Sequence, residues 1–407
     1  LEKNFRSYLG AKSAINKMIE YSKNTTGVYF SKSVLLENEY KQIKKKCDKI
    51  TILDQELGPA LSDNELKMAL LARKKLMISR YIDSYYVLGK KIYLKTQSVY
   101  PEFRNKIKLT GWPRVDLWNN YQFLYNKRVN EIKKKYKKFI LFSSDFSFKT
   151  KKNIEDHLNY LKLYGHKENE EIFIRAKKKA EGEYKEFKKF FKVFLKLDKL
   201  NLNNKIIIRP HPADDLKLWN KIGERFKNIL IIFDGDISEW LYASNGLMHR
   251  GCTTALQSVL SNKPTAYLAS DQNFIRETLT YDISEKLNNM EKIIDFINSP
   301  QLKKIKTDIE NIVHLDQNNS ACHNILEDIS NLGSKQTNPI NIKFFDVFKQ
   351  NCMSLKNKYI NRYNRVKMGN GINLDETVLY LNIIRGKKDF IVKKIFNDCL
   401  MIEKKNY

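Results

Sequence analysis

The clearest structural signal in the sequence is IIIRPHPADD, residues 206–215. Three isoleucines predict a buried strand, which must stop at the following Arg-Pro-His-Pro. A proline fixes its own φ and biases the residue before it away from the helical region. We therefore expect the strand to end in a fixed turn that gives Arg209 and His211 little freedom. His211, with Arg209 beside it, is a candidate contact for a phosphate at a strand end; the alternative is a histidine that caps or packs the strand.

Other apolar strands lie on both sides of this stretch and alternate with helical patterns. This alternation predicts parallel, layered α/β sheets. We predict two doubly wound Rossmann-type domains, at 1–130 and 131–332, and a basic, mainly helical extension at 333–407 after a linker near 331–340. The strands expected in the first domain are GVYFSKSV (27–34), KITILDQE (49–56) and SYYVLGK (84–90). Those of the second are KKFILFSSDFSF (137–148), KIIIRPHP (205–212), NILIIFDG (228–235) and PTAYLAS (264–270).

The composition narrows the class of protein. Net charge is +28, from 74 Lys and Arg against 46 Asp and Glu, which attracts polyanions such as phosphorylated sugars, anionic lipids or nucleic acid. The lysine excess is equally explained by compositional bias, and the sequence has no zinc-finger, basic-zipper or RNA-binding aromatic pattern, so we expect no nucleic-acid partner. No apolar run reaches the length of about 18 residues that a membrane span needs.

The cysteines and the first residue give two further expectations. Five cysteines are scattered without C-x-x-C or metal-ligand spacing, which predicts reduced thiols, a cytoplasmic location and no bound metal. The chain begins with Leu1 rather than Met, so we expect a piece to be missing at the N-terminus.

The segment LMHRGCTTALQSVL (247–260) predicts a strand end, a turn and a helix start. The glycine allows close backbone approach, and the two threonines suit the cap or first turn of the helix. A helix N-terminus offers unbonded N–H groups and partial positive charge, which suit a phosphate. The alternatives are an ordinary capped helix and, for the cysteine, a small packed residue. The candidate donor-binding residues here are His249, Arg250, Gly251, Cys252, Thr253 and Thr254.

Carboxylates follow two other predicted strands. Asp54 and Glu56, in ILDQELGPAL (52–61), lie two residues apart, so on an extended segment both point the same way. Asp145, in SSDFSF (143–148), ends the first strand of the second domain. A carboxylate there suits a general base on an acceptor hydroxyl or a nucleophile at an anomeric carbon. For all three residues the alternative is turn formation.

The turn TGWPRVDLW (110–118) lies between the two predicted domains. Its arginine, Arg114, is a candidate contact for an anionic group, because guanidinium matches phosphate and carboxylate geometry. The alternative is a simple hinge.

In this order, the segments YYVLGK…KIKLTGWPRVDLW, ILFSSDFSF, IIIRPHP and ASNGLMHRGCTTALQSVLSNKPTAYL resemble the bacterial surface carbohydrate biosynthesis proteins, which are GT-B glycosyltransferase-like. More distantly the chain is similar to CDP-glycerol glycerophosphotransferases and to the sialyltransferases and β-Kdo transferases. LDQELG looks like the Asp-Glu-Glu-Gly element of the first family, with Gln55 replacing an acid and Leu57 inserted. HLDQNNSACHNILEDI (314–329) resembles the family's closing segment, with Asp316 and Ser320 matching. The resemblance covers about residues 7–330 and implies that the first strand of the N-terminal domain is absent.

The resemblance implies a metal-independent, cofactor-free glycosyltransferase whose two domains face a cleft. His211 would contact the donor phosphate, 251–254 would seat it with Ser320 nearby, and Glu56 or Asp54 would face the acceptor. The expected reaction moves an acidic ulosonic-type sugar such as Kdo from a CMP donor to a glycan or lipid-linked acceptor in surface polysaccharide synthesis. One alternative is a polyol-phosphate transferase using CDP-glycerol or CDP-ribitol, whose Asp-Tyr-Ser-Ser element this chain replaces by His-Arg-Gly-Cys-Thr-Thr. Another is a non-catalytic carbohydrate-binding or membrane-surface protein.

The tail 341–407 has no counterpart in the resemblance. From Lys335 onward it carries 15 Lys and Arg against 6 Asp and Glu. It could hold the protein against the anionic inner face of the cytoplasmic membrane, where lipid-linked acceptors lie. A solvated extension that packs on the domain or joins copies of the chain is the alternative.

Overall fold

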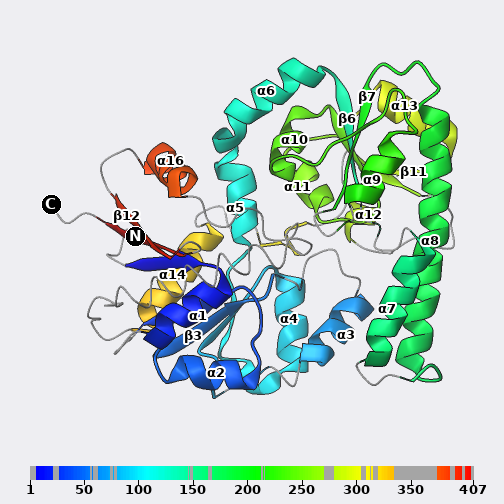
Figure 1. Ribbon diagram of the computed structural model, residues 1–407. Helices are drawn as coiled ribbons and strands as arrows, with labels where there is room; N and C mark the ends of the chain where they lie inside the picture. Colours follow the sequence, from blue (N-terminus) through cyan, green and yellow to red (C-terminus); the bar gives the residue numbers. More distant parts are fainter. Residues whose placement is uncertain are drawn as a thin grey trace. The chain divides into compact units, whose positions relative to one another are not determined.

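A computed structural model of the chain shows two compact units, each built on its own parallel sheet (Figure 1). The first unit comprises residues 1–124 and 308–407, and the second comprises 125–307. The residues that the structure describes are 6–21, 27–55, 57, 63–73, 77, 80–144, 146, 150–163, 167–211, 214, 216–269, 279–303, 309–311, 313–314, 320–333, 374–385, 390–396 and 399–404. Within these ranges, no helix is both long enough and apolar enough to cross a membrane.

The first unit has a four-stranded parallel sheet. Its strands follow one another in chain order: β2 (Val28–Ser31), β3 (Lys49–Leu53), β4 (Ser84–Val87) and β5 (Ile107–Leu109). The first three confirm the predicted strands. The helices of this unit are α1 (Lys12–Tyr21), α2 (Glu37–Lys44), α3 (Asp63–Arg73), α4 (Lys90–Val99), α5 (Pro113–Asn120), α14 (Ala321–Asn331) and α16 (Leu374–Arg385), with 3-10 turns at Pro101–Phe103 and Gln122–Tyr125.

Helices cover both faces of this sheet, as adjacent residues of β4 show. Tyr85 donates its hydroxyl to Asp54, which is also bonded by Arg73 of α3. Ser84 and Tyr86 instead donate theirs to Asp328 of α14, at 2.6 and 2.9 Å. Successive side chains of a strand point to opposite faces, so α3 and α14 pack on opposite sides.

The position of α14 corrects the predicted boundary at residue 332. Besides the bonds to β4, Asp116 of α5 accepts hydrogen bonds from the first two backbone N–H groups of α14, at 3.1 and 2.8 Å. Gly111, at φ +85°, lies so close to the start of α14 that a Cβ there would be 3.1 Å from Ala321. These contacts place 308–332 in the first unit, so the chain returns to it after completing the second.

In the described part of the tail, two strands form a third sheet beside the helix α16, whereas the sequence predicts a mainly helical extension. β12 (Phe390–Phe396) and β13 (Cys399–Lys404) pair antiparallel, and β13 also pairs with β1 (Ser7–Gly10). Arg6 and Glu403 form an ion pair across the β1–β13 pair. The runs of Phe, Ile and Val favour a pleated surface, and β1 supplies a partner strand almost 400 residues away in sequence. Of the described tail, only α16 confirms the helical expectation.

The second unit has a six-stranded sheet in which all neighbours are parallel, in the order β11-β10-β9-β6-β7-β8. Numbered from β6 as the first strand, this is the doubly wound order 3-2-1-4-5-6 read from the other edge. The order reverses between β6 and β9, which is where ligands bind in open α/β sheets. The strands are β6 (Phe139–Ser143), β7 (Lys205–Arg209), β8 (Leu230–Ile231), β9 (Gly246–His249), β10 (Thr265–Leu268) and β11 (Glu285–Leu287).

All four strands predicted for this domain are present as β6, β7, β8 and β10, which confirms the α/β class. The β6–β7 connection contains two helices that pack side by side, α7 (Lys151–Leu163) and α8 (Glu171–Leu197) (Figure 1). The later part of α8 packs Phe190, Phe194 and Leu197 into the core beneath the sheet. The remaining helices are α6 (Asn126–Tyr136), α9 (Leu216–Gly223), α10 (Ile237–Ala243), α11 (Thr254–Leu260), α12 (Leu279–Asp282) and α13 (Met290–Asn298).

Candidate functional site

The carboxyl ends of β6, β7 and β9 meet at the point where the strand order reverses. Ser143, the last residue of β6, pairs with Arg209 of β7 on one side and with His249 of β9 on the other. Just beyond, the N–H of Ser144 donates to the carbonyl oxygen of Arg209 at 3.0 Å. Segments that are more than 100 residues apart therefore lie side by side, and the two motifs singled out in the sequence belong to one edge of one sheet.

His211 comes directly after β7, and its side chain is exposed. Its backbone is held by Asp214: the His211 N–H donates to Asp214 Oδ2 at 3.1 Å, and the Asp214 N–H donates to the His211 carbonyl at 2.8 Å. The imidazole thus stands at the sheet edge on a closed turn. This is the placement that the prolines on either side of His211 predict.

His249, by contrast, is wholly buried, with an exposed fraction of 0%. Its Nδ1 accepts from the Gly251 N–H at 2.9 Å, so its Nε2 carries the proton and donates to Ser284 Oγ at 2.8 Å. That hydroxyl in turn donates to the Thr280 carbonyl. Burial lowers the pKa of His249 to about 3, which keeps the ring neutral. His249 therefore shapes the turn after β9, a role that does not favour the predicted donor contact, which stays a prediction.

Arg250 and Gly251 form that turn. The Arg250 guanidinium is buried and lies over the rings of Phe146 and Phe190, at 4.8 and 5.7 Å from their centroids. This placement does not favour the predicted contact with a phosphate. Gly251 has φ +115°, a region that side chains disfavour, which explains glycine here.

The helix after this turn is short. Thr253 occupies the N-cap position of the seven-residue α11, but among the described residues its hydroxyl makes no capping hydrogen bond. Cys252, Thr253 and Thr254 are half-buried. The predicted phosphate contacts of 251–254 stay a prediction.

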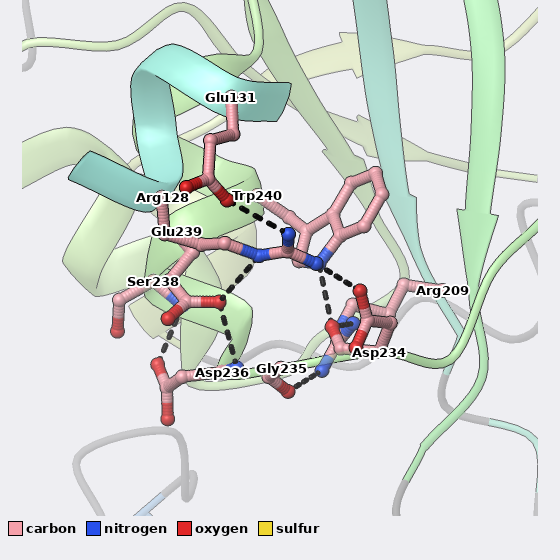
Figure 2. A network of polar contacts seen from close by, with 9 residues as sticks. All are labelled: Arg128, Glu131, Arg209, Asp234, Gly235, Asp236, Ser238, Glu239 and Trp240. Carbon is pink, nitrogen blue, oxygen red and sulfur yellow. Dashed lines mark hydrogen bonds and ion pairs between the residues drawn. The ribbon is translucent and has the colours of Figure 1, made fainter. Parts of the chain in front are cut away.

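Arg209 is turned away from the strand end into a polar network that Figure 2 shows. Its guanidinium donates to the carbonyls of Asp234 (2.6 Å) and Gly235, in the loop after β8. It also lies 5.5 Å from the ring centroid of Phe233. Burial lowers the pKa of Arg209, and nearby carboxylates oppose that shift. Arg209 therefore fixes the neighbouring loop, and its predicted contact with a donor stays a prediction.

The other side of the same loop is held from α6. Arg128 pairs with Asp234 and, at 3.9 Å, with Glu239 (Figure 2). Asp236 and Glu239 form a capping box at the start of α10, and the Trp240 indole donates to the Asp234 carbonyl at 2.6 Å. Burial raises the pKa of Glu239. The result is a loop fixed at both ends beside the carboxyl edge of β7.

Asp54, in the first unit, is buried in an ion pair. Its Oδ2 lies 2.7 Å from Arg73 Nε and also accepts from the Tyr85 hydroxyl at 3.3 Å. Only 1% of its side chain is exposed. A carboxylate committed in this way is a poor general base, so the geometry does not favour the predicted catalytic role. Glu56 and Asp145, the other two predicted catalytic carboxylates, lie outside the described residues.

Two further predicted residues have local roles. Ser320 caps α14 by accepting from the His323 N–H at 3.1 Å. Its predicted place among the donor contacts stays a prediction. Arg114 is exposed near the start of α5, with its guanidinium 5.6 Å from the Trp112 ring centroid. Its predicted contact with an anionic group stays a prediction.

Sequence reasoning missed the residues that hold the site in place. The Asp-x-x-Glu of Asp236 and Glu239 is a capping-box signature and was detectable. Arg128 lies in a lysine-rich helix and carries no such signal. Asp214 is buried and bonded to the His211 turn, and the sequence carries no signal for that role. The described residues include no group of three His, Cys, Asp or Glu side chains that could hold a metal ion.

The fold and these strand ends define a class: an α/β protein whose second unit has a doubly wound sheet, a kind of sheet that binds ligands at its switch point. No protein-family model matches the sequence, and no curated protein matches it. Membership in the surface carbohydrate biosynthesis family therefore stays a prediction.

Several solved structures are similar to the chain. One is a variant of the wall teichoic acid polymerase TagF, at 13% identity over 79% of this chain and 92% of that chain, with a TM-score of 0.42. Another is the UDP-GlcNAc 2-epimerase of Methanocaldococcus jannaschii in complex with UDP-GlcNAc and UDP, at 13% identity over 79% of each chain, with a TM-score of 0.44. A third is HepE of Anabaena in complex with UDP-glucose, at 9% identity over 75% and 74%, with a TM-score of 0.34. At these identities and TM-scores the similarities say nothing about activity.

Proposed function

We propose that the chain is a GT-B-type glycosyltransferase and that its second unit binds the phosphate of a nucleotide-activated donor at the β6–β9 switch point. One observation carries the proposal. The reversal of strand order brings the ends of β6, β7 and β9 into one row and leaves His211 exposed beside it. Open α/β sheets bind their ligands at such a point.

The proposed role of His211 is electrostatic. A histidine on a fixed turn can donate a hydrogen bond to a donor phosphate and stabilise the negative charge that grows as the nucleotide leaves. The buried His249 and Arg250 are not assigned this role. Both ring nitrogens of His249 are already hydrogen-bonded, and the Arg250 guanidinium lies over an aromatic ring. They keep the facing turn in place.

The finer assignments follow from the sequence resemblance. We propose a CMP-linked acidic sugar as donor, a glycan or lipid-linked acceptor of surface polymer synthesis, and a reaction that needs no metal or other cofactor. Glu56 is the proposed general base, since Asp54 is committed to Arg73. The proposed location is the cytoplasm, with the tail 341–407 against the inner face of the membrane.

A thermal-shift screen against CMP, CDP, UDP and GDP tests the donor. Ligand that binds only the native state raises its stability, by about 2.7 kcal/mol at a hundredfold excess over Kd. A response to CMP supports the acidic-sugar donor. A response to CDP alone favours the polyol-phosphate alternative, and a response to UDP or GDP alone overturns both.

His211→Ala tests the site. We expect turnover to fall by about 10²-fold or more, which is the usual effect of removing one charge-stabilising donor. His323→Ala is the matched control, because this exposed histidine lies on α14 in the other unit. Turnover equal to wild type in His211→Ala would remove His211 from the mechanism.

A further inference from the structure

Asp214 joins three elements of the second unit at the end of β7. Its Oδ2 accepts from the His211 N–H at 3.1 Å, from Trp219 Nε1 in α9 at 2.8 Å and from the Ser144 hydroxyl after β6 at 3.4 Å. The residue is only 8% exposed. Three donors converge on one oxygen, so the position calls for an acceptor and not for a group that also donates.

The neighbouring sequence explains why His211 depends on this carboxylate. Pro210 and Pro212 have no backbone N–H, so His211 supplies the only N–H of residues 210–212. Asp214 takes that N–H and returns its own to the His211 carbonyl at 2.8 Å. Both backbone polar groups of His211 are therefore bonded to one residue. Hydrogen bonds to a carboxylate are roughly twice as strong as those between neutral groups.

The same carboxylate ties the turn to the switch point. Ser144, which also donates to Asp214, is bonded through its N–H to the Arg209 carbonyl. A shift of the His211 turn would thus have to break contacts with both β6 and α9. Asp214 is too enclosed to act on a substrate itself.

We propose that Asp214 is a positioning residue that sets the backbone of His211 and so aims its imidazole at the donor phosphate. The proposal rests on the proposed function of the switch-point site. A positioning role and a purely structural role predict different results. If Asp214 positions His211, loss of its carboxylate weakens ligand binding, whereas an equally destabilising substitution at another position does not.

The first test needs no ligand. The chain has six histidines, so selective ¹⁵N-histidine labelling gives a simple amide spectrum, with the His211 peak assigned from His211→Gln. Asp214→Asn keeps the shape of the side chain but replaces the charged acceptor by a neutral amide, whose NH2 group is itself a donor. We expect the His211 amide proton to move upfield, because its charged acceptor is lost, and the His314 and His323 peaks of the other unit to stay in place.

The second test measures CMP affinity by calorimetry. We expect Asp214→Asn to weaken CMP binding by about tenfold, the equivalent of 1.4 kcal/mol. Trp219→Phe removes one donor to Oδ2 but keeps the His211 bond, and should bind CMP within about twofold of wild type. Asp198→Asn is the matched control. This residue is about as buried as Asp214, and its carboxylate accepts from three backbone N–H groups just before β8, at the amino ends of the strands.

The outcomes separate the two proposals. An unmoved His211 amide peak in Asp214→Asn overturns the positioning role, whatever the protein binds. Equal loss of CMP affinity in Asp214→Asn, Trp219→Phe and Asp198→Asn also overturns it, because the effect is then general destabilisation. Failure of the wild type to bind CMP counts against the proposed donor alone, and the amide spectrum still decides the positioning role.

Discussion

The buried histidine that ends β9, His249, predicts how the second unit responds to acid. The neutral ring of His249 accepts from Gly251 and donates to Ser284, so a second proton on Nδ1 would face the Gly251 N–H. Burial lowers its pKa to about 3. Above its unfolded pKa of about 6.5 the residue is neutral in both states. Between 6.5 and 3 only the unfolded state takes the proton, so stability is lost as the pH falls through this window.

The magnitude follows from linkage. Stability falls by up to about 1.4 kcal/mol per pH unit in this window. Integrated from pH 7 to pH 5, the loss from this one group is about 2 kcal/mol. His249→Asn does not titrate, and its side-chain oxygen can still accept from Gly251. We expect the variant to be less stable at pH 7 and to lose about 2 kcal/mol less than wild type between the two pH values.

Hydrogen exchange measured by mass spectrometry resolves the two units. Protection of the β6 and β9 amides, corrected for intrinsic exchange rates, reports opening of the second unit. The other titrating groups are the same in both proteins, so their contributions to the pH dependence cancel when the variant is compared with wild type. The same pH dependence in both proteins would refute the reasoning, because the His249 site would then accept a proton freely.

Two further predictions concern the first unit. Arg73→Met removes the ion-pair partner of the buried Asp54 and leaves the longer Tyr85 contact. We expect the free energy of opening measured at the β3 and β4 amides to fall by about 3 kcal/mol. Adding Asp54→Leu should restore part of this loss, and a further loss of similar size would contradict the ion-pair account. Asp116→Ala removes the acceptor for two N–H groups at the start of α14 and should lower the protection of 321–331 by about 1 kcal/mol, with a smaller loss in Asp116→Asn. Unchanged exchange in α14 would show that its docking on the sheet alone holds the helix.

Much of the fold could be predicted from sequence because its signals are local. The three isoleucines before Arg209 predicted a buried strand, and the structure has Ile206–Ile208 almost fully buried. The two prolines predicted a fixed turn at His211. Apolar runs and turn residues within about ten positions carry this information. The predicted strands were confirmed wherever the segment was both apolar and bounded by turn residues.

The roles of the charged candidates could not be predicted, because their partners are distant in sequence. Asp54 becomes a buried ion pair only because α3 brings Arg73 to it. Arg209 is drawn to the loop after β8, about 25 residues away. In an isolated segment, each of these side chains is equally able to face a ligand.

Residue patterns alone predict that the chain alternates strands and helices and that His211 lies on a rigid turn at the end of a strand. Hydrophobic spacing and proline chemistry act on neighbouring residues, so they need no tertiary context. The tertiary structure decided the order of the strands, the return of α14 to the first unit and the β1–β13 pairing. It also decided that His249, Arg250, Arg209 and Asp214 support the site from within. Burial and hydrogen bonds between distant segments exist only once the sheet is assembled. Only they distinguish a buried supporting residue from an exposed candidate such as His211.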